Sequence, residues 1–334
     1  MPIRCTVLGA GSWGTALAVQ LARMGHNTVL WDRHPDRCET INREHVNPRY
    51  LRSVQLPSAL RAESDLQASV EHAELLVTGV PSHALREVMV DAVRYLPAHA
   101  DVCCATKGIE SSSLQTMHGV LTDVLPASQH AQVSVLSGPS FALELATSLP
   151  TAVAIAGPED AAQRAAQAFH GQTFRAYHTE DIIGVCVGGS LKNVMAIACG
   201  VSDGAGFGSN TRAAIITRGL AEISRLAVAM GANPLTLMGL AGMGDLVLTC
   251  TGNLSRNRRV GLALGEGRTL QDILKELGEV AEGVTTAKSA WDLARKMEVD
   301  LPITQQVYQL LYEDKPVMEA LSDLLGRERR AERD

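Results

Sequence analysis

Apolar and polar positions in the first half of the chain follow two alternating patterns. Short apolar runs cover residues 5–8, 27–31, 75–78, 101–106, 133–136, 152–156 and 174–177. Between several of these runs apolar residues recur at helical spacing, as they do over residues 13–24 and 83–95. Strands that alternate with helices are typical of a doubly wound parallel sheet, so we predict such an α/β sheet up to about residue 180.

From residue 181 onward the apolar positions follow a helical period. The pattern predicts long helices over residues 183–201 and 211–230, and further helices that begin near Ser255 and Gly283. We find no strand-like alternation in this half and no Gly/Ser-rich linker before it. The sequence therefore predicts two domains, an α/β domain over residues 1–185 and an all-α domain over residues 186–334.

A glycine-rich turn, GAGSWG, directly follows the first predicted strand and contains Gly9, Gly11 and Gly14. In a dinucleotide-binding turn the first glycine permits a tight bend, the second lets the pyrophosphate approach the backbone, and the third lets helix and strand pack closely. Free N–H groups at the start of the helix, near Ser12, would then bind the anion. Glycine clusters usually mark ordinary turns, but the surrounding strand, helix and second strand favour a dinucleotide site here.

Composition narrows the partners and the compartment. The formal net charge is −6, which gives no electrostatic reason to expect binding to nucleic acid or to an anionic membrane. The seven cysteines form no Cys-x-x-Cys pair and most lie in apolar runs, which indicates a reducing compartment. We see neither a signal-peptide pattern nor an apolar run of membrane-spanning length. We therefore expect a cytoplasmic protein without a metal site and without stable membrane insertion.

The end of the second predicted strand carries Asp32 and Arg33, which have opposite charges. An acidic residue at this point would bind the adenosine ribose hydroxyls and favour NAD, whereas an arginine would favour the extra phosphate of NADP. A charged strand end that only faces solvent is the simpler alternative. The sequence leaves the preference between NAD and NADP open.

Two later strand ends carry further candidates. Lys107 and Gly108 follow the predicted strand over 101–106, and open parallel sheets bind ligands outside these carboxyl ends. Lys107 therefore faces a ligand or is a plain surface lysine. Gly138 and Ser140 lie in SGPSFA, another strand-to-helix turn, which a well-capped helix explains without any ligand.

The helical half places a few polar residues within apolar segments. Lys192 lies in the predicted helix over 183–201, where it either extends to solvent or, if it is buried at a cleft, exchanges a proton near neutral pH. Asp245 lies in the glycine-rich break GMGDL, where it is either a turn or cap residue or a partner that orients Lys192.

A third polar group, SRNRR, runs from Ser255 through Arg256 and Asn257 to Arg259. A capping serine, an amide and three cations at a helix start suit a phosphate ester, because helix N–H groups and a guanidinium converge on one anion. On an acidic protein we favour this interpretation over a solvated basic face. Glu282 precedes another predicted helix and is either a cap or a cofactor contact.

Together these segments resemble the motif series of the bacterial NAD(P)-dependent glycerol-3-phosphate dehydrogenase family. The matching segments are GAGSWGTA from Gly9, Lys107-Gly108, SGPSFA from Ser137, LKNV from Leu191, GDL from Gly244, SRNR from Ser255 and VAEG from Val280. The resemblance implies a Rossmann domain, a helical domain of the 6-phosphogluconate-dehydrogenase type, and a homodimer. It also implies reversible hydride transfer from NADH or NADPH to dihydroxyacetone phosphate, which gives sn-glycerol 3-phosphate, the precursor for glycerophospholipid synthesis.

The resemblance also implies individual roles. Cofactor contacts fall on Ser12, Trp13, Arg33, Lys107, Ala142, Arg256, Val280 and Glu282, in addition to the three glycines of the turn. Substrate contacts fall on Lys107, Gly138, Ser140, Lys192, Asp245, Ser255, Arg256 and Asn257. We expect Lys192 to be the acid/base group, Lys107 to stabilise charge on the substrate oxygen, and Asp245 to orient Lys192.

One departure from the family pattern is Gly188-Gly189, where a bulkier turn of helix is expected. Its effect on the helix that carries Lys192 is an open question. Two alternative functions also stay open: a related dehydrogenase for another phosphorylated or carboxylated hydroxy compound, and a non-catalytic module that senses NAD(P).

Overall fold

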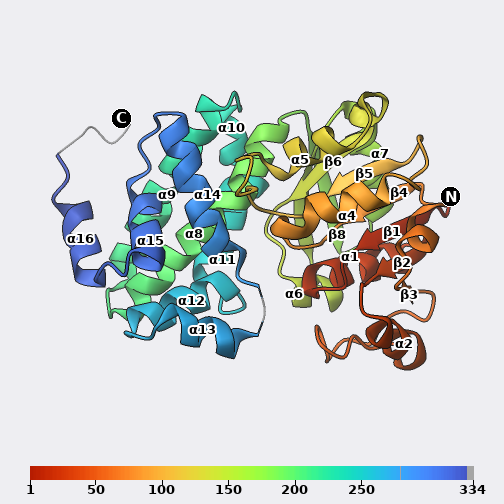
Figure 1. Ribbon diagram of the computed structural model, residues 1–334, viewed down its shortest axis with the longest axis horizontal. Coiled ribbons are helices and arrows are strands. Elements are labelled where there is room, and N and C mark those ends of the chain that lie inside the picture. Colours follow the sequence, from red (N-terminus) through yellow and green to blue (C-terminus); the bar gives the residue numbers. More distant parts are fainter. Residues whose placement is uncertain (279, 329–334) are drawn as a thin grey trace.

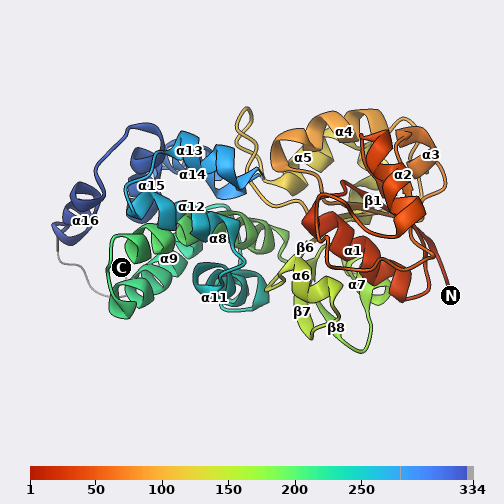
Figure 2. The same ribbon diagram turned by 90° about the horizontal axis from the view of Figure 1, so that it is seen from below.

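The computed structural model describes residues 1–278 and 280–328. An α/β half and an all-helical half lie side by side along the long axis of the molecule (Figures 1 and 2). Helix α8 (Ile182–Gly204) follows the last strand and forms the centre of the helical half. The predicted fold class is therefore confirmed, whereas the boundary at residues 185 and 186 stays a prediction.

Within the described residues one sheet of eight strands forms the core of the first half, in the order β3-β2-β1-β4-β5-β6-β7-β8. The strands are β1 (Arg4–Leu8), β2 (Asn27–Trp31), β3 (Arg61–Glu63), β4 (Leu75–Thr78), β5 (Asp101–Cys104), β6 (Val133–Ser137), β7 (Thr151–Ala156) and β8 (Phe174–Thr179). The strands β3, β2, β1, β4, β5 and β6 are parallel to one another, whereas β7 runs antiparallel to β6 and parallel to β8. The sequence did not predict β3, because this short edge strand has no apolar run.

Helices cover both faces of the sheet, as a doubly wound fold requires. They are α1 (Ser12–Arg23), α2 (Pro35–Glu44), α3 (Leu66–Val70), α4 (Leu85–Ala92), α5 (Met117–Val124), α6 (Ala142–Ala146) and α7 (Glu159–Phe169), with the short 3-10 helices η1 (Ser82–Ala84) and η2 (Ala127–Gln132). Leu17 of α1 and Phe169 of α7 belong to one buried cluster. Met89 of α4 and Leu121 of α5 belong to another.

The helical half packs around α8, which contacts α9, α11, α12, α14 and α15. Its remaining elements are α9 (Ser209–Ala229), α10 (Pro234–Leu237), the π-helical turn η3 (Leu240–Gly244), α11 (Asp245–Thr251), α12 (Arg256–Gly265), α13 (Leu270–Leu277), α14 (Glu282–Lys296), α15 (Pro302–Tyr312) and α16 (Val317–Leu325). Helix α16 lies at the outer end of the molecule (Figure 1).

The expectation that no apolar run reaches membrane-spanning length is wrong for α8. Its most apolar window has a mean hydropathy of 1.7, yet 83% of that window is buried inside the protein. The stretch Pro234–Thr251 meets the same criteria with a mean hydropathy of 1.3 and 39% burial. A buried core helix satisfies such criteria as readily as a membrane span does, so the burial of α8 accounts for its apolar composition.

Glycines allow α8 and α12 to approach each other closely. A Cβ atom added at Gly200 or Gly204 of α8, or at Gly261 or Gly265 of α12, would lie 2.1 to 2.3 Å from a backbone carbonyl oxygen of the other helix. The four-residue spacing places both glycines of each helix on one face. The two backbones therefore pack directly against each other, which fixes the start of α12 beside α8.

We expect Gly261→Ala to lower the free energy of unfolding by about 1–3 kcal/mol, because the added methyl group overpacks this contact. Gly119→Ala in α5 is the control, since the three heavy atoms nearest to its Cβ would all belong to the Gln115 side chain, the first of them at 3.2 Å. Denaturant unfolding of both variants measures the difference. Equal stability of the two variants would contradict the close contact.

Candidate active site

The turn between β1 and α1 forms an open cradle of backbone. Gly9 has a φ of +105°, and a Cβ on it would lie 2.9 Å from Val80 N. A Cβ on Gly14 would lie 1.9 Å from Gly9 O, whereas one on Gly11 would meet no heavy atom of the described residues within 4 Å. Since no described side chain caps α1, its first N–H groups are available to an anion. The cradle therefore fits a dinucleotide pyrophosphate.

Trp13 and Ser12, the expected cofactor contacts, open helix α1 and are both half-buried. The Trp13 indole donates from Nε1 to Ala105 O at 3.2 Å, which connects the cradle to the segment just after β5. The Lys107 ammonium lies 5.9 Å from the centre of the Trp13 ring. The glycine turn and Lys107 thus lie at the same edge of the sheet.

Lys107 lies in a loop that is fastened to the helical half. Ser190 Oγ of α8 accepts a hydrogen bond from Gly108 N at 3.1 Å and lies 3.0 Å from Gly108 O. Gly108 has a φ of +146°, and a Cβ on it would lie 2.7 Å from Ser82 Cβ, so only glycine fits. The Lys107 side chain is only 15% exposed, which excludes the interpretation as a plain surface lysine.

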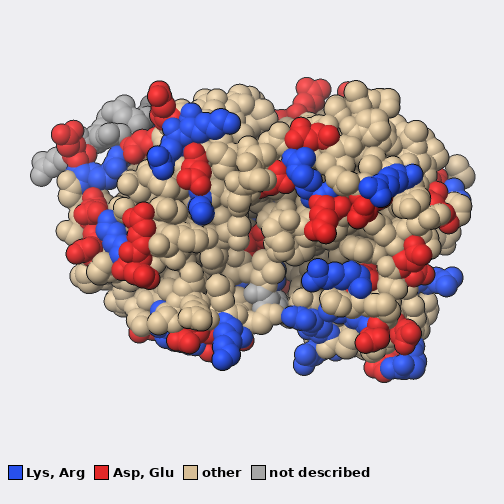
Figure 3. Space-filling model, in the orientation of Figure 1, with Lys and Arg blue, Asp and Glu red and all other residues tan. Residues whose placement is uncertain are grey.

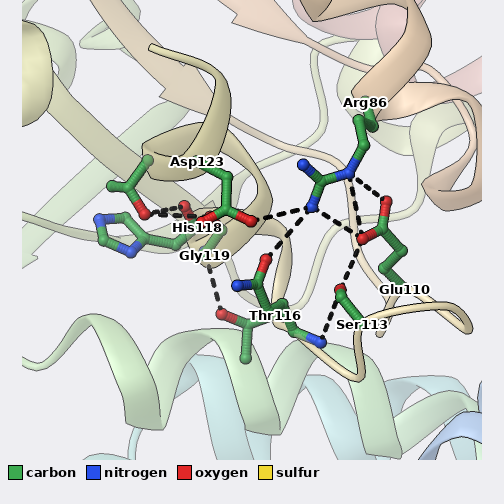
Figure 4. A network of polar contacts seen from close by, with 9 residues as sticks. Arg86, Glu110, Ser113, Thr116, His118, Gly119 and Asp123 are labelled. Carbon is green, nitrogen blue, oxygen red and sulfur yellow. Dashed lines mark hydrogen bonds and ion pairs between the residues drawn. The ribbon is translucent and has the colours of Figure 1, made fainter. Parts of the chain in front are cut away.

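Further along the same loop, a polar network fastens it to the flanking helices (Figure 4). Arg86 of α4 donates to Glu110 at 2.9 Å, to Gln115 at 3.3 Å and to Asp123 of α5 at 3.1 Å. Ser113 also donates to Glu110, at 2.5 Å. The hydrogen bonds from Arg86, above all, lower the pKa of Glu110 despite its partial burial. The loop is therefore held at both its start and its middle.

Two lysines from opposite halves of the chain share one buried carboxylate. Lys192 donates to Asp245 Oδ1 at 2.5 Å, and Lys107 donates to Asp245 Oδ2 at 2.7 Å. Asp245 has no exposed surface, and the Lys192 side chain is 10% exposed. Thr249, one turn later in α11, accepts a second hydrogen bond from Lys192 at 3.0 Å. Lys192 therefore does not extend to solvent, and the three expected catalytic residues lie together.

The contacts between Asp245 and the two lysines shift the pKa values of Lys192 and Asp245. Burial, followed by the charge of Lys107, lowers the pKa of Lys192 to about 8, although Asp245 opposes the shift. Burial alone would raise the pKa of Asp245, but the charges and hydrogen bonds of Lys107 and Lys192 outweigh it and lower that pKa. An amine with a pKa near neutral pH can give or accept a proton, and one anion between two cations leaves positive charge to stabilise an oxyanion.

The N-terminus of α12 holds the residues that were expected to bind a phosphate. Ser255 caps the helix by accepting from Arg258 N at 3.2 Å, and Asn257 Oδ1 accepts from Gly283 N at 2.9 Å. Arg256 is half-buried between them in sequence. The other two cations of the segment have different surroundings: Arg258 donates to Asp203 at 2.5 Å, and Arg259 is exposed. Arg256 is the first residue of α12.

Glu282 is the first residue of α14, and its side chain contacts the α/β half. Its carboxylate accepts hydrogen bonds from Ser82 N at 3.2 Å and from Ser82 Oγ at 2.5 Å. Burial raises its pKa, against the effect of these bonds. A Cβ on Gly283 would lie 2.6 Å from the carbonyl oxygen of Asn193, the residue after Lys192. The starts of α12 and α14 therefore meet the middle of α8 close to the loop after β4.

Comparison with known proteins agrees with this arrangement. A model of the N-terminal part of NAD-dependent glycerol-3-phosphate dehydrogenase matches residues 4–163, and a model of the C-terminal part of the same enzyme matches residues 181–322. The chain belongs to the NAD-dependent glycerol-3-phosphate dehydrogenase family. The resemblance found in the sequence is thereby confirmed, together with the oxidoreductase class and the NAD(P) cofactor.

Several relatives match over nearly the whole chain. The glycerol-3-phosphate dehydrogenase [NAD(P)+] of Anaeromyxobacter sp. (strain K) is 53% identical over 99% of this chain and 100% of its own length. That of Myxococcus xanthus is 53% identical over 99% of both chains. The crystal structure of glycerol-3-phosphate dehydrogenase from Coxiella burnetii is 43% identical and superimposes with a TM-score of 0.92 over 98% of this chain and 99% of that one.

Gly188 and Gly189, whose effect on the Lys192 helix the sequence left open, both lie at close contacts. Helix α8 is continuous through the pair. A Cβ on Gly188 would lie 2.6 Å from Ala241 O, and one on Gly189 would lie 2.6 Å from Ser137 Oγ. The open question is thereby answered for the helix, which the glycine pair does not break, and a larger residue at either position would push η3 or the end of β6 away from α8. The glycine pair lets the segment before Asp245 approach Lys192.

The loop after β6 holds Gly138 and Ser140. Gly138 has a φ of +151° and its Cβ would lie 2.8 Å from Val153 Cα, while Ser140 Oγ donates to Gly138 O at 2.9 Å. The well-capped helix expected here is wrong, since α6 begins only at Ala142 and no described side chain caps it. A Cβ on Gly244 would lie 3.5 Å from Pro139, so the loop lies beside the segment that carries Asp245.

Arg33 and Val280, two further expected cofactor contacts, lie at the surface. Arg33 is exposed just after β2, where it donates to His34 Nε2 at 3.3 Å. Val280 is 41% exposed just before α14. Sequence reasoning missed Thr249 and Ser82. Both had a signal: Thr249 is four residues after Asp245 and so shares its helix face, and Ser82 follows the end of β4.

Proposed function

We propose that this chain reduces dihydroxyacetone phosphate reversibly to sn-glycerol 3-phosphate, with NADH or NADPH as the hydride donor. The observation that carries the proposal is the pair Lys107 and Lys192 on buried Asp245, next to an open dinucleotide cradle in a member of this family. When bound, the nicotinamide cofactor supplies the hydride. The chain itself must bind the phosphate, orient the ketone and deliver a proton.

Lys192 is the proposed acid. Its ammonium group gives a proton to the ketone oxygen as negative charge develops there, and the neutral amine takes the proton back in the reverse reaction. Lys107 stabilises the developing charge, and Asp245 holds both ammonium groups in position. Thr249 and Asp245 together fix the Lys192 amine through two hydrogen bonds, at 3.0 and 2.5 Å.

Arg256, Ser255 and Asn257 are the proposed phosphate site, with Gly138 and Ser140 as further substrate contacts. The N-terminus of α12 supplies backbone N–H groups, and a guanidinium adds a charge-assisted hydrogen bond. Glu282, Val280 and Ala142 would complete the cofactor contacts. In this arrangement the phosphate anchors the substrate and thereby aligns its carbonyl with Lys192.

We expect Arg256→Ala to raise the KM for dihydroxyacetone phosphate about 30-fold with a smaller effect on kcat, since a lost charge-assisted contact costs about 2 kcal/mol. Steady-state kinetics at saturating cofactor measure the effect. The control is Arg259→Ala, which removes an exposed arginine from the same helix. An unchanged KM in Arg256→Ala would contradict the phosphate role.

Dihydroxyacetone phosphate reduction in parallel with NADH and with NADPH tests the activity directly. A panel of other phosphorylated or carboxylated ketones, followed by loss of reduced-nicotinamide absorbance, distinguishes a related dehydrogenase. A non-catalytic sensor would bind cofactor and consume none with any of these substrates. The lysine pair on Asp245 and the polar residues at the start of α12 argue against such a sensor.

We also propose that residues 1–185 bind the cofactor and that residues 186–334 complete the substrate site. Val185 and Cys186 pack in a buried cluster with the sheet, whereas Val187 and Leu191 pack in the cluster of the helical half.

All seven cysteines are buried and free, which supports a cytoplasmic location. Lys/Arg and Asp/Glu side chains intermingle on the face that Figure 3 shows, which suits a small-molecule enzyme. We also propose the homodimer that the resemblance implies, which light scattering would test.

A further inference from the structure

Asp32, the acidic residue after β2, is already occupied by a neighbouring arginine. Asp32 Oδ1 accepts a hydrogen bond from His34 N at 3.0 Å, and Oδ2 forms an ion pair with Arg37 Nη1. The Asp32 side chain is 4% exposed and that of Arg37 is 14% exposed. Both oxygens are therefore engaged, and the negative charge is neutralised within the protein. A ribose hydroxyl would have to compete with an internal ion pair for this carboxylate.

A second set of contacts fixes Arg37 at this place. Its guanidinium lies 5.5 Å from the centre of the Tyr50 ring, and Arg49 lies at the same distance from that ring. Asn47 positions this loop: its Oδ1 accepts from Tyr50 N at 3.0 Å, and its Nδ2 donates to Ala10 O, in the glycine turn, at 2.9 Å. Arg37 is thus held by residues anchored to the cradle itself.

We infer that Arg37 sets the cofactor preference by neutralising Asp32, so that the adenosine end of the site accepts the 2′-phosphate of NADP(H). A free carboxylate after the second strand would accept hydrogen bonds from the ribose of NAD(H) and repel a phosphate. Here the repulsion is cancelled, while the exposed Arg33 adds a second cation near the same strand end. Asp32, once neutralised, therefore no longer opposes Arg33. The inference rests on the nicotinamide cofactor of the proposed function.

The test is Arg37→Met, which keeps an unbranched apolar side chain against Tyr50 and removes the charge. Dissociation constants for NADPH and NADH are measured without substrate, by quenching of tryptophan fluorescence. We expect the ratio Kd(NADPH)/Kd(NADH) to rise about tenfold or more, because a charge-assisted pair exposes its anion when the cation is removed. Asp32→Asn in the same background should return the ratio close to that of the wild type, as a double-mutant cycle requires for a coupled pair.

Arg49→Met is the matched control, since Arg49 lies against the same ring. It should leave the ratio unchanged. Equal weakening of both cofactors by Arg37→Met would show that Arg37 only supports α2, and an unchanged ratio would show that Asp32 is not coupled to it. Either result would overturn the inference. Wild-type protein that binds neither cofactor would instead contradict the proposed function, so the two failures are distinguishable.

Discussion

Lys192→Met is expected to lower kcat for dihydroxyacetone phosphate reduction by about 10³-fold, within the range that general acid catalysis contributes. Methionine fills the space of the lysine stem, and Asp245 keeps Lys107 as its ion-pair partner, at 2.7 Å. The buried carboxylate is therefore not left alone, and the variant should fold. Single-turnover and steady-state rates, together with the Kd for NADH, separate the lost chemistry from lost binding.

Cofactor affinity should stay within about threefold of wild type in this variant, because no atom of Lys192 is needed to hold the pyrophosphate cradle. Lys288→Met on the exposed side of α14 is the control for removal of one lysine from the helical half. If Lys192→Met kept more than a tenth of the wild-type kcat, Lys192 would not be the acid, and Lys107 would become the candidate.

Local patterns in the sequence predicted the parts of this site that depend on one segment at a time. The cradle followed from three glycines after an apolar run, and Ser255 followed from cap chemistry at a helix start. The strand-end rule selected Lys107, whose ammonium group contacts Asp245 and lies near Trp13. In each case the physical cause lies within a few residues of the group, so a single sequence contains it.

Pairings across the chain could not be predicted from such patterns. Lys107 and Asp245 are 138 residues apart in sequence, and nothing local tells which cation a buried carboxylate will meet. The same holds for Arg258, which looked like a phosphate ligand and binds Asp203 instead. Gly188-Gly189 suggested a weakened helix, whereas the glycine at position 188 is explained by tertiary packing against Ala241. Resemblance to a family favoured the pairing of Asp245 with Lys192, which physical reasoning had left as one of two alternatives.

Asp245→Asn is the second large effect that we expect. In the wild-type enzyme Lys192 has a pKa of about 8, so the rate of ketone reduction, which requires the ammonium form, should fall as the pH rises through that value. Asparagine preserves the shape but removes the attraction that opposes burial and the Lys107 charge. The Lys192 pKa then decreases further, the amine is neutral at pH 7, and kcat at that pH should fall by about 10²-fold or more.

The position of the pH limb separates this role from a merely structural one. Asp101→Asn is the control, because it removes another buried aspartate from an ion pair, with Arg164 at 2.7 Å, at the opposite end of β5 from Lys107. Loss of an ion-pair partner should destabilise both variants, by about 3 kcal/mol where the cation left behind is buried. Only Asp245→Asn should move the fall in reduction rate to a lower pH and, for the same reason, make oxidation less dependent on high pH. A limb that stays near pH 8 while kcat falls would mean that Asp245 positions a group other than the titrating amine.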